Sequence, residues 1–221
     1  MNDADQAPLI RRIASVVGHE LRNPMAVINN SAYFVRAKLA QTTLDPKVEK
    51  HLKIIESEIA RADRLIGDML TFSRAYEPSV ETKLFDALVK EAVAACAAPD
   101  GGKIELKLSA KDAVVKADVK AFHDAVKRLL DNAFDAQEGK GTARVATGAD
   151  KSGVFVTVSD AGKGVDAKIK DALFEPFVTT KPRGMGLSLA LARKLLGAVG
   201  GAVSCDSSSK GATFKIVLPK A

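Results

Sequence analysis

One histidine near the N-terminus has the neighbours that nucleophilic chemistry requires. It lies in the stretch from Gly18 to Pro24, which includes His19, Glu20 and Asn23. A helix turns by ~100° per residue, so His19 points away from the apolar stripe and Asn23 lies one turn on along the same face. Imidazole is largely uncharged near neutral pH and presents a free lone pair, which makes His19 a candidate nucleophile, although an exposed histidine is by default a solvated surface residue. A metalloprotease zinc site is excluded, because Asn23 stands where a second histidine is required.

Two polar groups farther along the chain are suited to a bound nucleotide. Asn132 lies in an expected helix, and its amide oxygen is a hard ligand of the kind that suits Mg²⁺, although an asparagine on a helix is more often structural. Asp160 follows an expected strand, where its carboxylate can accept a hydrogen bond from the exocyclic amine of adenine. Gly162 and Gly164 come next, and glycines allow a close backbone approach and positive φ angles. Either feature alone is weak support for a nucleotide site.

A third segment places glycines immediately before an expected helix. Its residues are Gly184, Met185, Gly186 and Leu187. Backbone N–H groups at a helix N-terminus bind anions, so this segment is a candidate phosphate cradle. Lys181, just upstream, could add a positive charge.

Two long helices are expected to position the histidine. The segment from Pro8 to Lys38 has apolar residues at helical spacing, a turn is expected from Thr42 to Pro46, and a second helix follows. Seven apolar positions of the second helix keep a strict heptad register, which is typical of a coiled-coil seam: Val48, Leu52, Ile55, Ile59, Ala62, Ile66 and Met69. One partner helix cannot cover both apolar stripes. We therefore expect an antiparallel hairpin that pairs with a second chain in a dimeric four-helix bundle.

The three nucleotide-type segments fall in a second region with a different pattern. Tyr76 to Ser79 breaks the helix and marks the expected domain boundary. The expected helices are 85–98, 118–138 with Asp118 as its cap, and 187–199; the expected strands are 104–109, 114–117, 143–148, 154–159, 202–205 and 213–218. A long loop from Ala161 to Gly186 carries one short helical piece at 167–174. This order predicts a two-layer α/β sandwich after the hairpin, and an α+β chain as a whole.

Composition and charge exclude several classes of protein. The chain has 221 residues and a net charge of +6, but its lysines are interleaved with acidic residues, and it has no Trp and only two Tyr, so nucleic acid is not the expected ligand. Anionic nucleotides and acidic partner proteins suit the same charge. No run approaches the ~20 apolar residues of a membrane-spanning helix, so this chain is expected to be soluble, without membrane contact of its own. Cys96 and Cys205 lack metal-site spacing and are expected to be reduced thiols in the cytoplasm.

Five motifs, taken in order, resemble those of the sensor histidine kinases of two-component signalling. The corresponding segments are 18–24 for the H box, 132–133 for the N box, 160–164 for the G1 box, 174–177 for the F box and 184–187 for the G2 box. The resemblance extends from Arg11 to Leu218, and five motifs in register are far more specific than one. It implies a dimerisation and histidine-phosphotransfer domain at 8–76 and a catalytic ATP-binding domain of the Bergerat (GHKL) fold at 80–221.

The resemblance also implies an activity and roles for individual residues. Such a kinase would phosphorylate His19 from Mg-ATP and pass the phosphoryl group to an aspartate of a response-regulator receiver domain. Glu20 would accept or orient the imidazole proton, and Asn23 would position water for a reverse phosphatase activity. The loop 175–183 would be a mobile lid in which Thr179, Thr180 and Lys181 contact phosphate, the alternative being an ordinary polar loop. ATP would be held by Asn132, also the Mg²⁺ ligand, and by Asp160, Gly162, Gly164, Gly184, Met185, Gly186 and Leu187.

Two positions depart from the family pattern. Many members have a further asparagine four residues before the N-box asparagine, where this chain has Arg128, and a third glycine in the G2 box, where it has Ser188. Arg128 either contacts phosphate or faces solvent, and its presence weakens the case for efficient Mg²⁺ binding. Ser188 is tolerated at a helix start, so little effect is expected there.

Two other interpretations compete with the kinase. ATPases of the gyrase, Hsp90 and mismatch-repair kind share the Bergerat fold, but they resemble one another in carrying a catalytic glutamate at the position of Arg128, and they lack the hairpin with the H box. A degenerate kinase would use the dimer only as a docking scaffold or phosphorelay. Intact His19, Asn132 and Asp160 argue against that interpretation, whereas Arg128 and Ser188 argue for it.

Overall fold

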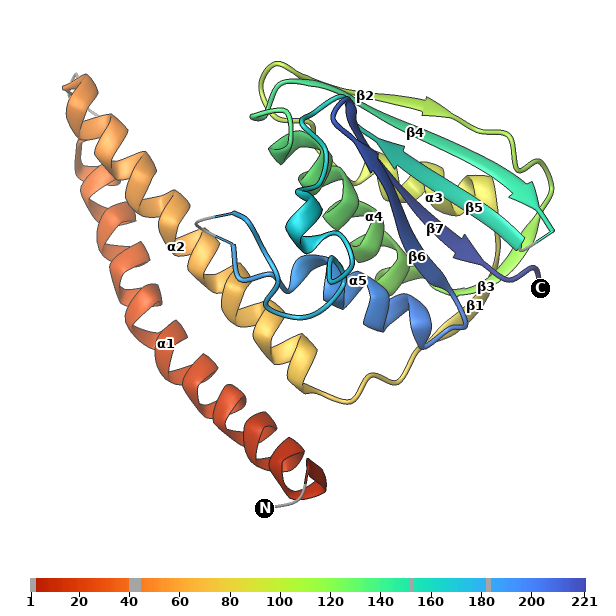
Figure 1. Ribbon diagram of the computed structural model, residues 1–221. Coiled ribbons are helices and arrows are strands. Elements are labelled where there is room, and N and C mark those ends of the chain that lie inside the picture. Colours follow the sequence, from red (N-terminus) through yellow and green to blue (C-terminus); the bar gives the residue numbers. More distant parts are fainter. Residues whose placement is uncertain (1–2, 40–44, 152, 182–183) are drawn as a thin grey trace. The chain divides into compact units, whose positions relative to one another are not determined.

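The chain folds as two compact units (Figure 1). The structure, a computed structural model, describes residues 3–39, 45–151, 153–181 and 184–221, and for residues 3–15 and 19 it describes the backbone alone. The first unit comprises Met1–Ala75 and the second Tyr76–Ala221.

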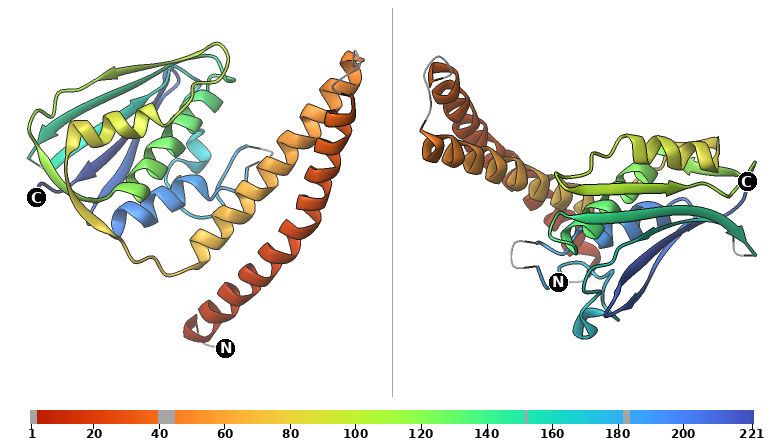
Figure 2. Two further views of the ribbon diagram at one scale, coloured as in Figure 1. Left: turned by 180° about the vertical axis from the view of Figure 1, so that it is seen from behind. Right: turned by 90° about the horizontal axis from the view of Figure 1, so that it is seen from above.

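A helical hairpin forms the first unit. Helix α1 spans Asp3–Leu39 and helix α2 spans Pro46–Ser73, and the two lie side by side and antiparallel (Figures 1 and 2). Asp45 caps α2, because its carboxylate accepts a hydrogen bond of 2.7 Å from the backbone N–H two residues on. Pro46 takes the first helical position, where no N–H donor is needed. Residues 42–44 of the predicted turn lie outside the described residues.

A glycine allows the two helices to approach closely next to the histidine motif. An added Cβ at Gly18 would lie 3.1 Å from Ile66 Cγ2 and 3.1 Å from Leu70 Cδ1. Both of these side chains are buried, and Met25 packs against them. The glycine of the H box therefore has a packing role in the hairpin.

The heptad seam predicted on α2 is only partly covered within one chain. Leu52 and Ile66 are buried, whereas Val48 and Ile55 are 42% and 40% exposed. The structure also buries Leu70, which lies outside the predicted seam. A helix of 3.6 residues per turn drifts by ~20° per heptad relative to a strict seven-residue repeat, so one straight partner cannot contact all seven positions. The exposed apolar positions are surface that a second chain would cover.

The second unit is built on a five-stranded sheet. Its strands are β2 (Gly102–Lys107), β4 (Gly141–Asp150), β5 (Gly153–Ser159), β6 (Ala202–Ser208) and β7 (Gly211–Leu218), in the spatial order β2-β4-β5-β7-β6. β2 pairs parallel to β4, and the other neighbours pair antiparallel. Val154, Val156 and Val158 of β5 are fully buried, and alternate residues of a strand point to the same face. The hydrophobic core of the second unit lies on that face of the sheet.

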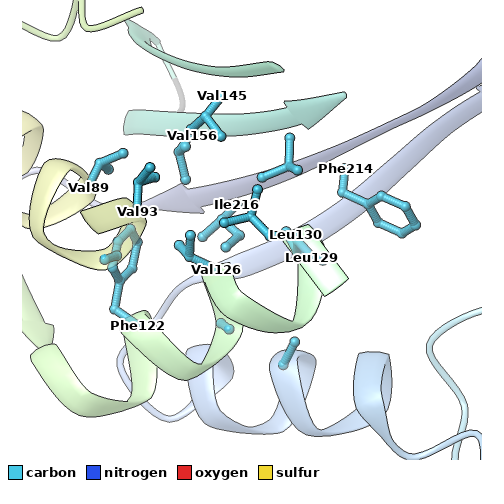
Figure 3. Close-up of a cluster of buried hydrophobic side chains, with 14 of the residues drawn as sticks. Val89, Val93, Phe122, Val126, Leu129, Leu130, Val145, Val156, Phe214 and Ile216 are labelled. Atoms are coloured by element: carbon cyan, nitrogen blue, oxygen red, sulfur yellow. The ribbon is translucent and has the colours of Figure 1, made fainter. Parts of the chain in front are cut away.

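Three helices cover this face of the sheet. They are α3 (Phe85–Ala94), α4 (Val119–Asp135) and α5 (Ser188–Gly197), and Figures 1 and 2 show them on one side. In the core, Val126 and Leu129 of α4 come together with Val145, Val156 and Ile216 of the sheet (Figure 3). The predicted two-layer α/β sandwich is confirmed.

A two-stranded sheet ties the segment after the hairpin to the start of α4. β1 (Val80–Leu84) pairs antiparallel with β3 (Val114–Asp118). The Asp118 carboxylate caps α4, accepting from the N–H of Ala121 at 2.9 Å, as predicted. It also accepts from the N–H of Ser79 at 2.7 Å and from the Tyr76 hydroxyl. One buried carboxylate therefore fixes both the start of α4 and the segment that precedes β1.

The structure corrects several predicted elements. β1 was not predicted, because its side chains are mostly exposed and give no buried stripe. The helix predicted to reach residue 98 ends at Ala94; its alanine-rich end favours helix, but Pro99 disfavours helical backbone before it. The helical piece predicted at 167–174 is a single 3-10 turn, Ala167–Ile169. The helix predicted from Leu187 starts one residue later.

Candidate active site

The histidine motif lies within α1. Residue 19 belongs to this helix, but the His19 side chain lies outside the described part of the structure, so its expected exposure stays a prediction. Glu20 and Asn23 are exposed. Pro24 lies inside the helix, where it has no N–H to donate to the carbonyl of Glu20.

Asp160 is a buried acceptor at the end of β5, and it is only 8% exposed. Its Oδ1 accepts hydrogen bonds from the N–H of Gly162 at 2.8 Å and from the N–H of Ala212 at 3.3 Å. Its own N–H donates to the carbonyl of Ala212 at 2.9 Å. The carboxylate is therefore held rigidly between the loop and β7, as recognition of one edge of a base requires.

Three glycines stand where the backbone leaves no room for a side chain or adopts a left-handed conformation. An added Cβ at Gly162 would lie 2.5 Å from the carbonyl oxygen of Ala136, just beyond α4. Gly164 and Gly186 have φ of +72° and +71°. An added Cβ at Gly186 would also lie 2.6 Å from the backbone N of Val178. These glycines bring the two candidate nucleotide loops close to neighbouring backbone.

A lysine of the predicted lid reaches the predicted metal ligand. The Nζ of Lys181 donates to Oδ1 of Asn132 at 2.8 Å and to Oδ2 of Asp135 at 2.6 Å. The amide nitrogen of Asn132 is buried and has no hydrogen-bond partner among the described residues. Asp135 was missed by the sequence reasoning. Its position three residues after Asn132, on the same face of a helix, could have identified Asp135 as part of the site.

The glycine segment leads into a helix without a side-chain cap. Helix α5 begins at Ser188 after Leu187, and no side chain in the described part of the chain accepts a hydrogen bond from its first turn. Its first N–H groups can therefore bind an anion. Gly184 and Met185 come just before, exposed and half-buried respectively.

Two further hydrogen bonds involve residues of the predicted lid. The N–H of Phe177 donates to the carbonyl of Gly186 at 3.1 Å and closes the base of the loop. The N–H of Lys181 donates to Oγ1 of Thr179 at 3.0 Å, and Thr180 is exposed. Residues 182–183 of the predicted lid lie outside the described residues.

Arg128 does not face solvent, and that alternative was wrong. Its side chain is 14% exposed, and its Nε lies 2.8 Å from Oδ2 of Asp124, one turn earlier on α4. The burial follows from the helix, which places residue 128 between the buried Ala125 and Leu129. Contact of Arg128 with phosphate stays a prediction.

Both cysteines are free and half-buried. Burial, with a smaller effect of the Asp160 carboxylate, raises the pKa of Cys205 to about 11. Burial also raises the pKa of Cys96. The thiols therefore stay protonated near neutral pH, as expected of structural cysteines.

The oxygen atoms around Asn132 suit Mg²⁺. Carboxylate and amide oxygens are the hard ligands that Mg²⁺ accepts, and here two of them already share one cation, the Lys181 ammonium. Among the described residues no group of three or more His, Cys, Asp or Glu could hold a metal by itself. The chain alone therefore provides only part of an octahedral site, and nucleotide phosphates and water would complete it.

Two protein-family models match the chain. Residues 9–77 match the His Kinase A (phospho-acceptor) domain, and residues 117–221 match the family described as Histidine kinase-, DNA gyrase B-, and HSP90-like ATPase. The first match contains the histidine motif and the second contains Asn132, Asp160 and the glycine segment. The chain belongs to the sensor histidine kinase family. The phospho-acceptor match distinguishes this histidine kinase core from the gyrase and Hsp90 ATPases that share the second domain.

Curated sensor kinases are similar to almost the whole chain. The signal transduction histidine-protein kinase AtoS of Escherichia coli is 29% identical, over 99% of this chain and 36% of its own length. The sensor protein FixL of Bradyrhizobium diazoefficiens is 31% identical, over 95% of this chain and 43% of its own length. The histidine kinase core thus spans less than half the length of these relatives.

Solved histidine kinases share the fold. Full-length ShkA in complex with AMPPNP has a TM-score of 0.74 at 24% identity, over 95% of this chain and 46% of that one. Histidine kinase ThkA in complex with response regulator protein TrrA has a TM-score of 0.69 at 21% identity, over 99% of this chain and 64% of that one. Within the described residues, no helix combines the length and apolar character needed to cross a membrane.

Proposed function

We propose that the chain is an ATP-dependent protein histidine kinase that phosphorylates His19 from Mg-ATP and transfers the phosphoryl group to an aspartate of a response-regulator receiver domain. The observation that carries the proposal is the presence, in one chain, of a phospho-acceptor hairpin and a nucleotide-type domain with a buried, backbone-fixed Asp160. We assign residues 8–76 to dimerisation and phosphotransfer and residues 80–221 to ATP binding. The AMPPNP complex of ShkA and the TrrA complex of ThkA support both ligands.

Each part of the nucleotide has a candidate partner in the second unit. The Asp160 carboxylate would accept a hydrogen bond from the amino group of adenine, and Gly162 and Gly164 would let the loop backbone come close to the base. The uncapped N-terminus of α5 and the Lys181 ammonium would bind phosphate oxygens. Asn132 would hold Mg²⁺, which when bound neutralises charge on the phosphates.

The first chemical step forms a bond from nitrogen to phosphorus. The lone pair of the His19 imidazole attacks the γ-phosphorus, the bond from that phosphorus to the bridging oxygen breaks, and ADP leaves with the electron pair. Glu20, next to His19 and exposed, would accept or orient the proton on the other ring nitrogen and stabilise the cationic ring.

The second step returns His19 to its starting state. A carboxylate oxygen of the receiver aspartate attacks the phosphorus, and the bond from nitrogen to phosphorus breaks. Asn23 would position a water molecule for the reverse phosphatase reaction, in which that water hydrolyses the acyl phosphate. Because the proposed reaction consumes ATP and both cysteines are free rather than joined in a disulfide, we place the chain in the cytoplasm.

A homodimer is supported by apolar surface on the hairpin. Val16, Val27 and Phe34 of α1 are 55%, 65% and 61% exposed. At ~100° per residue these three positions share one stripe of the helix. A second copy of the chain would bury them in a four-helix bundle.

The fate of the γ-phosphate of ATP distinguishes the proposed kinase from the two alternatives, an ATPase and a docking scaffold. The chain is incubated with Mg-ATP labelled at the γ-phosphate, and label on protein and free phosphate are measured separately. A kinase places label on the chain, and a receiver domain added later removes it. Free phosphate without protein label would instead show an ATPase, and neither product would show a scaffold.

A further inference from the structure

Asn132 and Asp135 together hold a cation. The oxygen pair formed by Asn132 Oδ1 and Asp135 Oδ2 accepts two hydrogen bonds, of 2.8 and 2.6 Å, from the one ammonium of Lys181. The two residues are three apart on α4 and therefore neighbours on one face of the helix. Their oxygens converge on a point that a positive charge already occupies.

The other aspartates of α4 pair within the helix. Asp124 pairs with Arg128 at 2.8 Å and Asp131 with Lys127 at 2.6 Å, each four residues away. Asp135 takes its cation from the lid, 46 residues farther along the chain. It is therefore the carboxylate of α4 that is directed at the candidate nucleotide site.

The lysine in this contact can be displaced. The side chains of Lys181 and Asp135 are 47% and 60% exposed, and ion pairs exposed to that degree contribute little stability. Mg²⁺ carries twice the charge of an ammonium and prefers carboxylate oxygen. A lysine released from the oxygen pair would gain phosphate oxygens as new partners.

We propose that Asp135 is a second protein ligand of the Mg²⁺ that accompanies ATP, beside Asn132, and that Lys181 occupies the oxygen pair until Mg-ATP arrives. This inference rests on the proposed function. Mg²⁺ is commonly bound by one or two carboxylates together with substrate phosphates, and Asp135 provides that carboxylate. Asp135 would also supply a metal-binding oxygen that this chain lacks at position 128, where many family members have an asparagine and this chain has Arg128.

The test compares two matched aspartates of one helix. Asp135 and Asp131 are both 60% exposed, and both form ion pairs of 2.6 Å. The dissociation constant of ATP is measured in Mg²⁺ and in EDTA for the wild type, Asp135→Asn and Asp131→Asn, and the ratio gives the enhancement of binding by Mg²⁺. We expect Asp135→Asn to lower the enhancement about tenfold, because even residues that only orient metal ligands typically contribute about 10–100-fold to metal affinity. Asp131→Asn should match the wild type.

The two conditions also distinguish a metal ligand from a structural residue. Without metal, Asp135→Asn removes a negative charge near the phosphates, so ATP binding in EDTA should not weaken. Equal weakening in Mg²⁺ and in EDTA, or an enhancement equal to that of Asp131→Asn, would overturn the inference. A wild type that bound ATP in neither condition would overturn the proposed function as well.

A second measurement tests the place of Lys181. Mn²⁺ substitutes for Mg²⁺, and electron paramagnetic resonance follows its binding to the nucleotide-free chain. Lys181→Gln removes the resident cation and should tighten Mn²⁺ binding, whereas Lys127→Gln, which frees the paired Asp131, should do so less. Equal binding by the two variants would contradict the assigned exchange.

Discussion

Gly162 approaches the carbonyl oxygen of Ala136 so closely that a Cβ on the glycine would lie 2.5 Å from it. The contact joins the loop that carries Asp160 to the end of the helix that carries Asn132. Because the neighbour is backbone rather than a flexible side chain, the loop would have to move to admit a methyl group. Gly162 therefore fixes the loop of Asp160, the candidate adenine contact, against the helix of Asn132, the candidate metal ligand.

Gly162→Ala is expected to weaken ATP binding by about tenfold or more, since a methyl group forced against packed backbone costs about 1–3 kcal/mol. Binding of a fluorescent ATP analogue measures the effect. Gly197→Ala is the matched control, because an added Cβ there meets nothing within 4 Å and alanine favours the helix. Unchanged affinity in Gly162→Ala would contradict the tight loop.

The parts of the site that could be predicted rest on local patterns. Asp160 was predicted at a strand end because the preceding alternation is produced by side chains that really are buried, Val154, Val156 and Val158. The cap at Asp118 was predicted because a capping side chain bonds the backbone a few residues on. The two long helices were predicted from the helical spacing of their apolar residues.

The parts that could not be predicted depend on contacts between distant residues. The bond between Lys181 and Asp135 requires the path of the lid, which no local spacing specifies. β1 was missed because an exposed strand has no apolar stripe. The ion pair of Arg128 with Asp124 is an exception, because a spacing of four residues on one helix is a local signal that could have predicted it.

Asp160→Asn is expected to reduce the preference for ATP over GTP by about tenfold or more, since unpaired buried polar groups underlie this kind of selectivity. Asparagine keeps an oxygen for the N–H groups of Gly162 and Ala212, so the loop should stay in place. Its amide NH₂ cannot accept from adenine but can donate to the carbonyl of guanine. Competition binding with both nucleotides measures the change, and equal use of ATP and GTP by the wild type would refute this role.

Asp118 should make folding of the second unit sensitive to acid. Burial alone would raise its pKa, but bonds from Ala121 N–H, the Tyr76 hydroxyl and Ser79 N–H together lower the pKa below its ordinary value of 3.8. A lowered native pKa stabilises the fold above that value, and this stability is lost as the pH falls through the native pKa. Asp118→Asn should flatten the pH dependence below about pH 4.

Urea unfolding followed by circular dichroism measures this effect, because the chain has no Trp. Asp118→Ala should lower the free energy of unfolding by about 1–3 kcal/mol, through loss of the cap and of the bonds to Ser79 and Tyr76. Asp166→Asn, an exposed cap of the short 3-10 turn, serves as control. Identical pH profiles for wild type and Asp118→Asn would count against the role of this carboxylate.

Val27→Asp should separate the dimer. Val27 is 65% exposed in one chain, and a charge in the apolar stripe would have to be buried without a partner. We expect the dimer to weaken roughly a hundredfold in dissociation constant, which sedimentation equilibrium can measure. Tyr33 is 71% exposed but lies on another face of α1, so Tyr33→Asp should leave the dimer intact. A stable Val27→Asp dimer would exclude this stripe from the interface.

The most direct test of phosphorylation at His19 uses the three histidines of the chain, His19, His51 and His123. Wild type and three single variants to Gln are incubated with Mg-ATP labelled at the γ-phosphate, and label on the protein is followed through acid and alkali. Phosphorylation at His19 predicts label that acid removes and alkali preserves, lost in His19→Gln and kept in His51→Gln and His123→Gln. Label that persists in His19→Gln, or no label on the wild type while it binds ATP, would contradict it.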